Sequence, residues 1–273
     1  MSKTARDSAT ELRKASKRKP EDEREPGSPP KKSKKLHGSS SQRRKVETPS
    51  KPASTAVPAK DRSVNIDSGI AERDPSLLAD LFAQKIAKHY KDSSLIERED
   101  MSVPKSWIID TTEFDQPHTA GHLPGYLEKF AGGGRDKLLT GAKEASPDTL
   151  IVACSGIRVA DLVRELRVYD TKDSKVAKLI AKHMKLKENI EYLAKTKVGI
   201  AVGTPARLYD LVEQGGLKID ELKTVVVDGS YLDEKRRGIW DMGDVFGALM
   251  RLLHHERVKG RLESEDGAKV VVF

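Results

Sequence analysis

The fold of this 273-residue chain is decided by residues 225–231, Val225-Val226-Val227-Asp228-Gly229-Ser230-Tyr231. Three consecutive β-branched residues predict a strand that is buried on both faces, because a half-buried strand would alternate apolar and polar residues. Asp228 then stands at the carboxyl end of that strand. In open α/β sheets this is the edge at which ligands bind, so we expect any functional site there.

Other apolar runs predict further strands at 150–154, 198–202 and 269–273. Helical spacing of apolar residues predicts helices at 159–168, 174–193, 206–213 and 239–258. Strands that alternate with helices predict an α/β fold with a parallel sheet covered by helices on both faces. We place this domain at residues 146–273.

Residues 1–65 form a basic tail that is predicted to be disordered, because it holds almost no large apolar side chains. Positions 1–60 carry 17 basic and 7 acidic residues, whereas the rest of the chain is close to neutral. Two basic clusters predict nuclear or nucleolar import signals: Lys17, Arg18 and Lys19, and Lys31, Lys32, Lys34 and Lys35. A second interpretation, compatible with the first, is that the tail also binds RNA phosphates through counterion release.

Residues 66–145 predict a helical and extended region that packs on the core. Asp74 is a good N-cap and Pro75 suits the first helical position of an amphipathic helix that runs to Tyr90. Its apolar stripe favours packing within the protein, and a partner-binding helix is the alternative. Residues 107–109 predict a short strand or extended arm, and 132–134 a glycine loop. The chain has one cysteine, no apolar run long enough for a membrane span and no secretory signal, so we expect an intracellular protein without a membrane partner.

A second motif, Gly203-Thr204-Pro205-Ala206-Arg207-Leu208, directly follows a predicted strand. Thr204 would act as N-cap and Pro205 would open the next helix, whose N-terminus attracts phosphate with Arg207 in its first turn. Taken alone, the motif is a weak signal, because such a turn is most often only a capped strand-to-helix junction.

Combined with residues 222–228 at this spacing, the turn resembles the first RecA-like domain of the DEAD-box RNA helicases. The resemblance implies that Thr204, Pro205 and Arg207 contact the RNA backbone, and that Arg158, in Ser155-Gly156-Ile157-Arg158, does so as well. It also implies that Asp228 corresponds to the acid that coordinates Mg²⁺. Two positions depart from the family: Ala206 replaces a glycine, and Gly229 replaces the glutamate that orients the attacking water.

The phosphate-binding loop of that family is missing, since none of the 20 glycines precedes a lysine. Thr140-Gly141-Ala142-Lys143 resembles an eroded remnant of such a loop. However, only five residues separate Lys143 from the strand that begins at Thr149, which leaves no room for the helix that a P-loop opens. The chain also stops where the family continues into a second RecA-like domain. We therefore expect no catalytic residue, no metal, no cofactor and no enzymatic activity.

The basic tail, the segment Leu77-Leu78-Ala79-Asp80-Leu81-Phe82-Ala83-Gln84 and the turn at 202–208 together resemble the Cms family. The resemblance implies a non-catalytic ribosome biogenesis factor of the nucleus and nucleolus, associated with the 90S pre-ribosome or small-subunit processome. Implied partners are pre-rRNA, pre-ribosomal assembly proteins and the U-three snoRNP. Two alternatives remain: an ATP-dependent RNA helicase fragment or partner-completed ATPase, and a chromatin or DNA-binding nuclear protein.

Overall fold

The computed structural model describes residues 65–131, 133–140, 142–182 and 184–273. The predicted disordered tail and its import clusters, from Lys17 to Lys35, lie outside the described residues, as does Gly132 of the predicted glycine loop. Within the described part, no helix is long and apolar enough to cross a bilayer.

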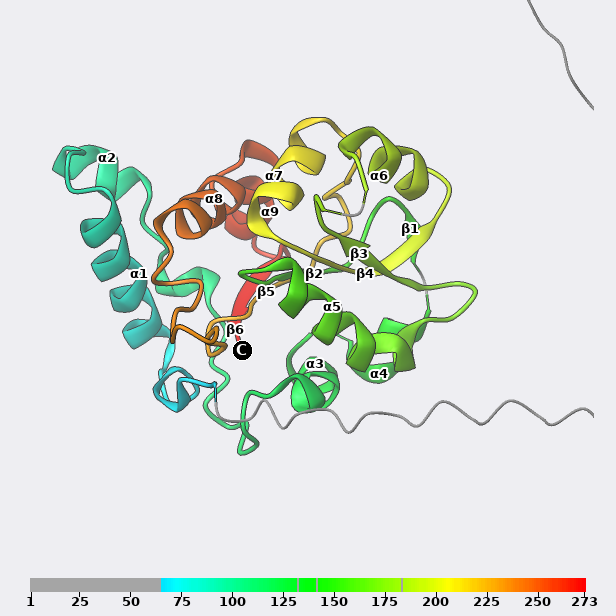
Figure 1. Cartoon of the computed structure of the whole chain (residues 1–273), viewed down its shortest axis with the longest axis horizontal. Helices are drawn as coiled ribbons and strands as arrows, with labels where there is room; N and C mark the ends of the chain where they lie inside the picture. The colour runs from blue at the N-terminus through cyan, green and yellow to red at the C-terminus, as the bar shows by residue number, and fades with distance from the viewer. Residues whose placement is uncertain (1–64, 132, 141, 183) are drawn as a thin grey trace, which may run out of the picture. The chain divides into compact units, whose positions relative to one another are not determined.

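Five parallel strands form the centre of a single sheet (Figure 1). Their spatial order is β3 (Lys175–Leu179), β4 (Lys197–Gly203), β2 (Thr149–Val152), β5 (Thr224–Val227) and β6 (Lys269–Val272). A sixth strand, β1 (Lys143–Glu144), pairs antiparallel with the beginning of β4. The predicted α/β fold with a mainly parallel sheet is confirmed.

Alternate residues of each central strand enter two separate hydrophobic cores. Val225 and Val227 lie in one core with Leu150, whereas Val226 lies in the other with Ile151. The first face is covered by α6 (Leu186–Leu193), α7 (Pro205–Glu213), α8 (Gly243–Leu253) and α9 (Glu256–Glu263), and the second by α3 (Leu123–Phe130), α4 (Gly134–Leu139) and α5 (Gly156–Glu165). Burial on both faces explains why these strands are continuous apolar runs.

The helix predicted over residues 174–193 is wrong in its first half. Residues 175–179 are strand β3, which pairs in parallel with β4, and only 186–193 are helical. The burial of Ala177 and Leu179 around the exposed Lys178 follows the two-residue period of a strand. Pairing with a central strand outweighs the local helical spacing of Val176, Leu179 and Ile180.

The predicted helix 239–258 is divided into two helices, α8 and α9. His254 is the C-cap of α8, and the His255 side chain accepts a hydrogen bond from the Arg257 backbone as N-cap of α9. The other predicted helix on the sheet's second face begins three residues early, at Gly156, and continues after Glu165 as a 3-10 turn, η4 (Leu166–Tyr169).

The part of the predicted region 66–145 that precedes α3 lies along the edge of the sheet at β6 and packs against both cores. The region holds α1 (Pro75–His89), α2 (Leu95–Asp100) and three 3-10 turns, η1 (Ser68–Ile70), η2 (Lys105–Trp107) and η3 (Ala120–His122). The Asp74 carboxylate caps α1, as predicted. The predicted arm after η2 makes a single parallel bridge, Ile108 with Val270. We propose that this region folds together with the sheet as one cooperative unit.

The Phe82→Ala substitution tests that cooperation. Phe82 is fully buried in α1 and meets the Trp240 ring edge-on at 5.0 Å, so its removal leaves a cavity between α1 and the sheet domain. We expect the free energy of unfolding to fall by about 3–5 kcal/mol, in one denaturant transition for the whole chain. Leu95→Ala, at an exposed position of α2, is the control and should change stability little. A separate early transition in Phe82→Ala would show that residues 65–145 unfold independently.

Candidate functional site at the carboxyl edge of the sheet

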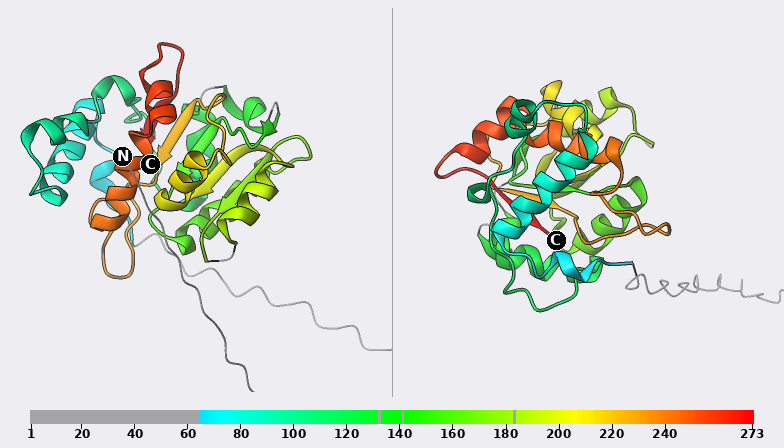
Figure 2. Two further views of the ribbon diagram at one scale, coloured as in Figure 1. Left: turned by 90° about the horizontal axis from the view of Figure 1, so that it is seen from above. Right: turned by 90° about the vertical axis from the view of Figure 1, so that its left-hand side faces the viewer.

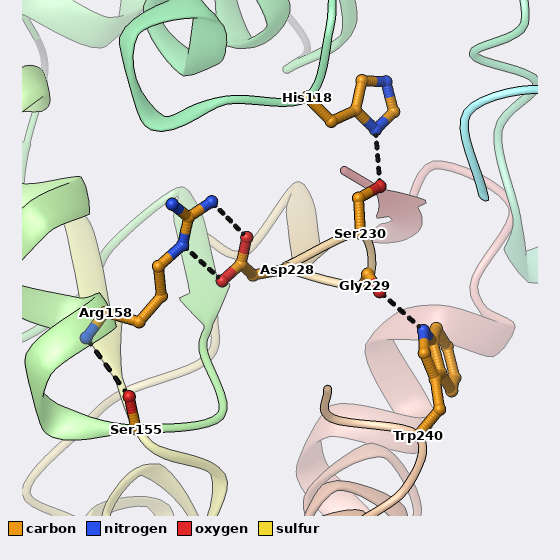
Figure 3. Close-up of polar contacts among 7 residues, drawn as sticks. All are labelled: His118, Ser155, Arg158, Asp228, Gly229, Ser230 and Trp240. Carbon is orange, nitrogen blue, oxygen red and sulfur yellow. Dashed lines mark hydrogen bonds and ion pairs between the residues drawn. The ribbon is translucent and has the colours of Figure 1, made fainter. Parts of the chain in front are cut away.

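The carboxyl ends of β2, β5 and β6 converge on one group of polar side chains (Figure 3). Asp228 follows β5, Ser155 follows β2, and the chain reaches Phe273 directly after β6. His118 comes from the segment between the Ile108 bridge and α3. This is the edge at which open α/β sheets bind ligands, as the sequence predicts for Asp228.

Asp228 is bound by Arg158 in a bidentate ion pair. Arg158 Nε donates to Asp228 Oδ2 at 2.9 Å, and Nη2 donates to Oδ1 at 2.8 Å. The Asp228 residue is 1% exposed and Arg158 is 5% exposed. Burial acts to lower the pKa of Arg158, but the Asp228 carboxylate and its hydrogen bonds outweigh burial and raise that pKa. Two parallel hydrogen bonds between a guanidinium and a carboxyl group are the strong, bidentate form of this interaction.

Two further contacts position Arg158, one at its backbone and one at its guanidinium. The Ser155 hydroxyl accepts a hydrogen bond from the Arg158 backbone at 3.2 Å and so caps α5. The Tyr231 ring lies 4.5 Å from Arg158 Cζ, a cation–π distance. Because both Asp228 oxygens face Arg158, the residues present do not fit a magnesium ion, which requires accessible carboxylate oxygens.

Gly229 is enclosed by packed side chains. A Cβ atom at this position would lie 2.6 Å from Val272 Cγ1 and 3.0 Å from Trp240 Cζ2. The Trp240 indole also donates to the Gly229 carbonyl at 2.8 Å. No side chain fits here without a rearrangement, so the space that a catalytic glutamate would need is filled by Trp240 and Val272.

The third part of the edge is an aromatic cluster around His118. Its Nδ1 lies 3.0 Å from Ser230 Oγ, and its ring stacks on Phe273 at 4.7 Å. Tyr126 meets both rings and donates its hydroxyl to the Val272 carbonyl at 3.0 Å. Burial lowers the pKa of His118 to about 4, so the imidazole is neutral at physiological pH.

The predicted remnant of a phosphate-binding loop is wrong in its location. Lys143 lies in β1, which pairs with the first residues of β4, and it forms an ion pair with Glu221. This is the amino edge of the parallel strands, opposite Asp228. P-loops join a strand to the helix that follows it. The segment 109–122 joins the isolated bridge at Ile108 to α3, and its His118 is buried in the aromatic cluster.

The predicted RNA-contacting turn has the expected backbone, although its side chains are largely covered. Thr204 is the N-cap of α7 and Pro205 its first residue, but the Thr204 hydroxyl makes no capping bond. Arg207 is 8% exposed and reaches Asn189 Oδ1 in α6 at 3.4 Å. The structure brings Arg158 to Asp228 and Arg207 to Asn189. RNA contact by Arg158, Thr204, Pro205 or Arg207 stays a prediction.

Sequence reasoning misses several residues of this site, among them His118, Tyr231 and Trp240. His118 has no metal-ligand spacing, and its position in the sequence suggests an ordinary histidine. Tyr231 stands out only as a mismatch to a helicase motif. The one available signal is Trp240, since only two tryptophans occur in the chain and the residue follows Asp228 closely.

A Gly229→Glu substitution, which introduces the glutamate expected from the DEAD-box resemblance, is expected to destabilise the fold and to give no ATPase activity. The new side chain would clash with Val272 and Trp240 and would bury a carboxylate, at a cost of about 3 kcal/mol or more. Gly260→Glu is a matched control, because a Cβ on that exposed α9 residue meets nothing within 4 Å. Chemical denaturation and phosphate release with RNA would be measured for both variants. Wild-type stability in Gly229→Glu, or RNA-stimulated ATP turnover, would contradict this account.

His118 is expected to make stability depend on pH. In the unfolded chain it takes up a proton near pH 6.5, but in the folded protein only near pH 4, because of burial. Unfolding therefore takes up a proton in this window, and stability falls as pH drops from about 6.5 to about 4, by about 3 kcal/mol in all. His118→Phe should remove this component from denaturation curves recorded across the window. Ser230→Ala, which keeps the imidazole, should lower stability but retain the pH dependence.

Comparisons with known proteins give one consistent result. A family described as "CMS1: U3-containing 90S pre-ribosomal complex subunit" matches residues 6–273. "Protein CMS1" of Chaetomium thermophilum is 42% identical over 210 residues, which are 75% of this chain and 83% of that protein. "Protein CMSS1" of Homo sapiens is 32% identical over 185 residues, 67% of this chain and 63% of that protein. The chain thus spans less than two thirds of the human relative's length.

Solved structures similar to this chain include two of Saccharomyces cerevisiae Dbp5. One, bound to Nup159, Gle1, IP6 and ADP, matches 69% of this chain and 45% of the other at 13% identity, with a TM-score of 0.38. The second, bound to RNA and ADP BeF3, matches 50% of this chain and 30% of the other at 17% identity, with a TM-score of 0.34. No functional conclusion follows from likenesses at this level.

Proposed function

Since this chain belongs to the CMS1 family of U3-containing 90S pre-ribosomal complex subunits, we propose that it is a non-catalytic component of the 90S pre-ribosome. In this role it contacts pre-rRNA and assembly proteins, and the U-three snoRNP is one of the neighbouring particles. The protein acts in the nucleolus. Its helicase-like domain serves as a rigid adaptor and not as a motor.

The observation that carries the non-catalytic part is the ion pair between Arg158 and Asp228. Nucleotide hydrolysis requires an acid that can hold Mg²⁺ and a group that positions water. In this chain the acid is neutralised by a buried guanidinium, and the adjacent position is a glycine with no space for a side chain. A fold that has replaced both groups with packing interactions retains surfaces for binding but lacks the means to turn over nucleotide.

A partner-completed ATPase is the competing function, and it faces a specific cost. A partner could supply a lysine or arginine in trans, but Asp228 would first have to leave Arg158. Breaking such a buried pair costs about 3–5 kcal/mol, because the partner left behind is an uncompensated charge. The competing function would also need a site for phosphates, while the segment 109–122 is anchored by the His118 stack on Phe273.

The basic tail supports the nucleolar location. Its clusters of lysine and arginine are of the kind that import receptors and nucleic acids both recognise, and 17 basic residues within positions 1–60 give it a strong affinity for polyanions. A pre-ribosome, rich in RNA phosphate, is a suitable destination for such a segment.

The test is affinity purification of the tagged full-length chain from nucleolated cells, followed by gradient sedimentation and sequencing of bound RNA. We expect sedimentation with 90S particles and enrichment of U-three snoRNA and pre-rRNA, with or without depletion of ATP. A tagged nuclear protein of similar net charge is the control for non-specific binding to RNA. Sedimentation as free protein only, or recovery with chromosomal DNA instead of RNA, would contradict the proposal.

A further inference from the structure

A basic hollow lies at the amino edge of the parallel strands, the edge opposite Asp228. It has a volume of about 590 Å³ and lies between the loop that joins α7 to β5 and the helix α9, red in Figure 2. Three cationic residues and one acid line it, so the lining carries two net positive charges. The lining consists of Gly215, Lys218, Ile219, Asp220, Arg257 and Arg261.

The loop forms one wall of the basic hollow and carries Lys218. The lysine is exposed, whereas Leu217 and Ile219 on either side of it are buried. Gly215 has a φ of 68°, in the left-handed region that favours glycine, so the wall has no side chain at this position. A Cβ there would lie 3.9 Å from Arg257 Nη1. The loop and α9 therefore face each other closely at this end of the hollow.

Two arginines of α9 form the opposite wall. Arg257 and Arg261 are four residues apart, a spacing that places both on one side of the helix. Val258 and Leu262 are buried and anchor the other side. Arg261 Nη2 donates to the Leu222 carbonyl at 3.0 Å, which fixes the guanidinium in the wall. Because like charges at this spacing repel each other, an anion between the two arginines would stabilise the helix.

Among the described residues, the three cations of the basic hollow have no acidic partner. The Lys218 ammonium and the Arg257 guanidinium form no ion pair and donate no hydrogen bond there, and Arg261 donates only to a carbonyl. Arg261 Nε is buried and has no hydrogen-bond partner in the same part of the chain. A partly buried charge without a partner costs free energy, and a bound anion offsets part of that cost.

The uncompensated positive charge is confined to this hollow. Cations beside it are paired with acids, Lys143 with Glu221 and Lys259 with Glu263. A surface that follows an RNA strand needs a continuous groove of cations, since the charge of the strand is spread along its backbone. A phosphomonoester instead concentrates about 1.5 to 2 negative charges on three acceptor oxygens at pH 7. The charge of the lining therefore favours a single phosphate group over a nucleic-acid strand.

We propose that the basic hollow binds the phosphate group of a phosphorylated serine or threonine in a partner protein. Arg257 and Arg261 hold phosphate oxygens from one wall, and Lys218 holds them from the other. Guanidinium groups match phosphate oxygens in geometry, and arginine clusters are a recurring means of binding phosphorylated segments. The inference rests on the proposed function and deepens it, because it gives the contact with assembly proteins a site and a chemical signal.

The test compares three forms of the full-length chain: wild type, Lys218→Gln/Arg257→Gln, and the control Arg167→Gln/Lys187→Gln. The control removes one arginine and one lysine from exposed positions of η4 and α6. Affinity is measured by fluorescence anisotropy for a labelled glycine-rich peptide with a central phosphoserine. The same peptide with serine or glutamate at that position is measured in parallel. Thermal midpoints of the three forms should agree, because the substituted side chains are exposed.

We expect the wild type to bind the phosphoserine peptide roughly tenfold more tightly than the serine peptide, with the glutamate peptide in between. The Lys218→Gln/Arg257→Gln variant should lose roughly tenfold in affinity for the phosphoserine peptide, because it lacks two charged hydrogen-bond donors. The control variant should match the wild type, and inorganic phosphate should compete with the peptide. Equal affinity of the wild type for the phosphoserine and serine peptides would overturn the inference, as would an equal loss in both variants.

An oligouridine with a 5′-hydroxyl end separates a protein ligand from RNA. Its affinity should be the same for the Lys218→Gln/Arg257→Gln variant and the control variant, since both lose the same charge. A specific decrease for oligouridine in the first variant, as large as that for the phosphoserine peptide, would assign the basic hollow to RNA and overturn the inference.

The two proposals can fail separately. If the wild-type chain does not sediment with 90S particles but binds the phosphoserine peptide through the basic hollow, the proposed function fails and the phosphate site stands. If the wild type sediments with 90S particles and does not distinguish phosphoserine from serine, only the phosphate site fails.

Discussion

The buried ion pair between Arg158 and Asp228 is the constraint on which the rest of the carboxyl edge depends. It joins the first turn of α5 to the end of β5, and so connects the two central strands through their loops. Desolvating two charges is expensive, and the cost is recovered only if the geometry is good and each charge has its partner. Ser155, which caps α5, and Tyr231, which stacks on the guanidinium, are arranged to meet that requirement.

Around this pair, the edge is closed by packing where related folds keep a ligand site. Trp240 fills the space next to Gly229 and binds its carbonyl, while His118 and Tyr126 enclose Phe273. This edge holds a strand end with an acid, Asp228 after β5, and a loop that leads into α3. Their side chains meet one another, so the sheet edge gains rigidity in place of a substrate. Cys154 fits this picture, because burial and the charge of Asp228 raise its thiol pKa to about 12 and leave it unreactive.

Local pattern is sufficient to predict some parts of this structure and insufficient for others. The valines before Asp228, the Asp74 cap and the turn at Thr204–Pro205 are encoded within a few residues, and the backbone of each can be predicted from them. Strand β3 cannot be predicted in this way, because it is a strand only through its pairing with β4. Its lysines also obscure the two-residue period of burial. Arg158 and its partner Asp228 are 70 residues apart in the sequence, and His118 and Ser230 are 112 residues apart. Contacts over such separations cannot be predicted from the local periodicity of the sequence. The sequence also does not show which guanidinium groups are covered, as those of Arg158 and Arg207 are.

The glycine at position 229 has a consequence for any redesign of this edge. A glutamate would fit there only if Trp240 and Val272 also changed to smaller residues, and a ligand would reach the Asp228 oxygens only if Arg158 released them. Each change alone weakens packing or leaves a buried charge, so the effects of these substitutions on stability would not be additive. Position 229 is therefore coupled to its neighbours through packing, and only a compensated set of substitutions would open it.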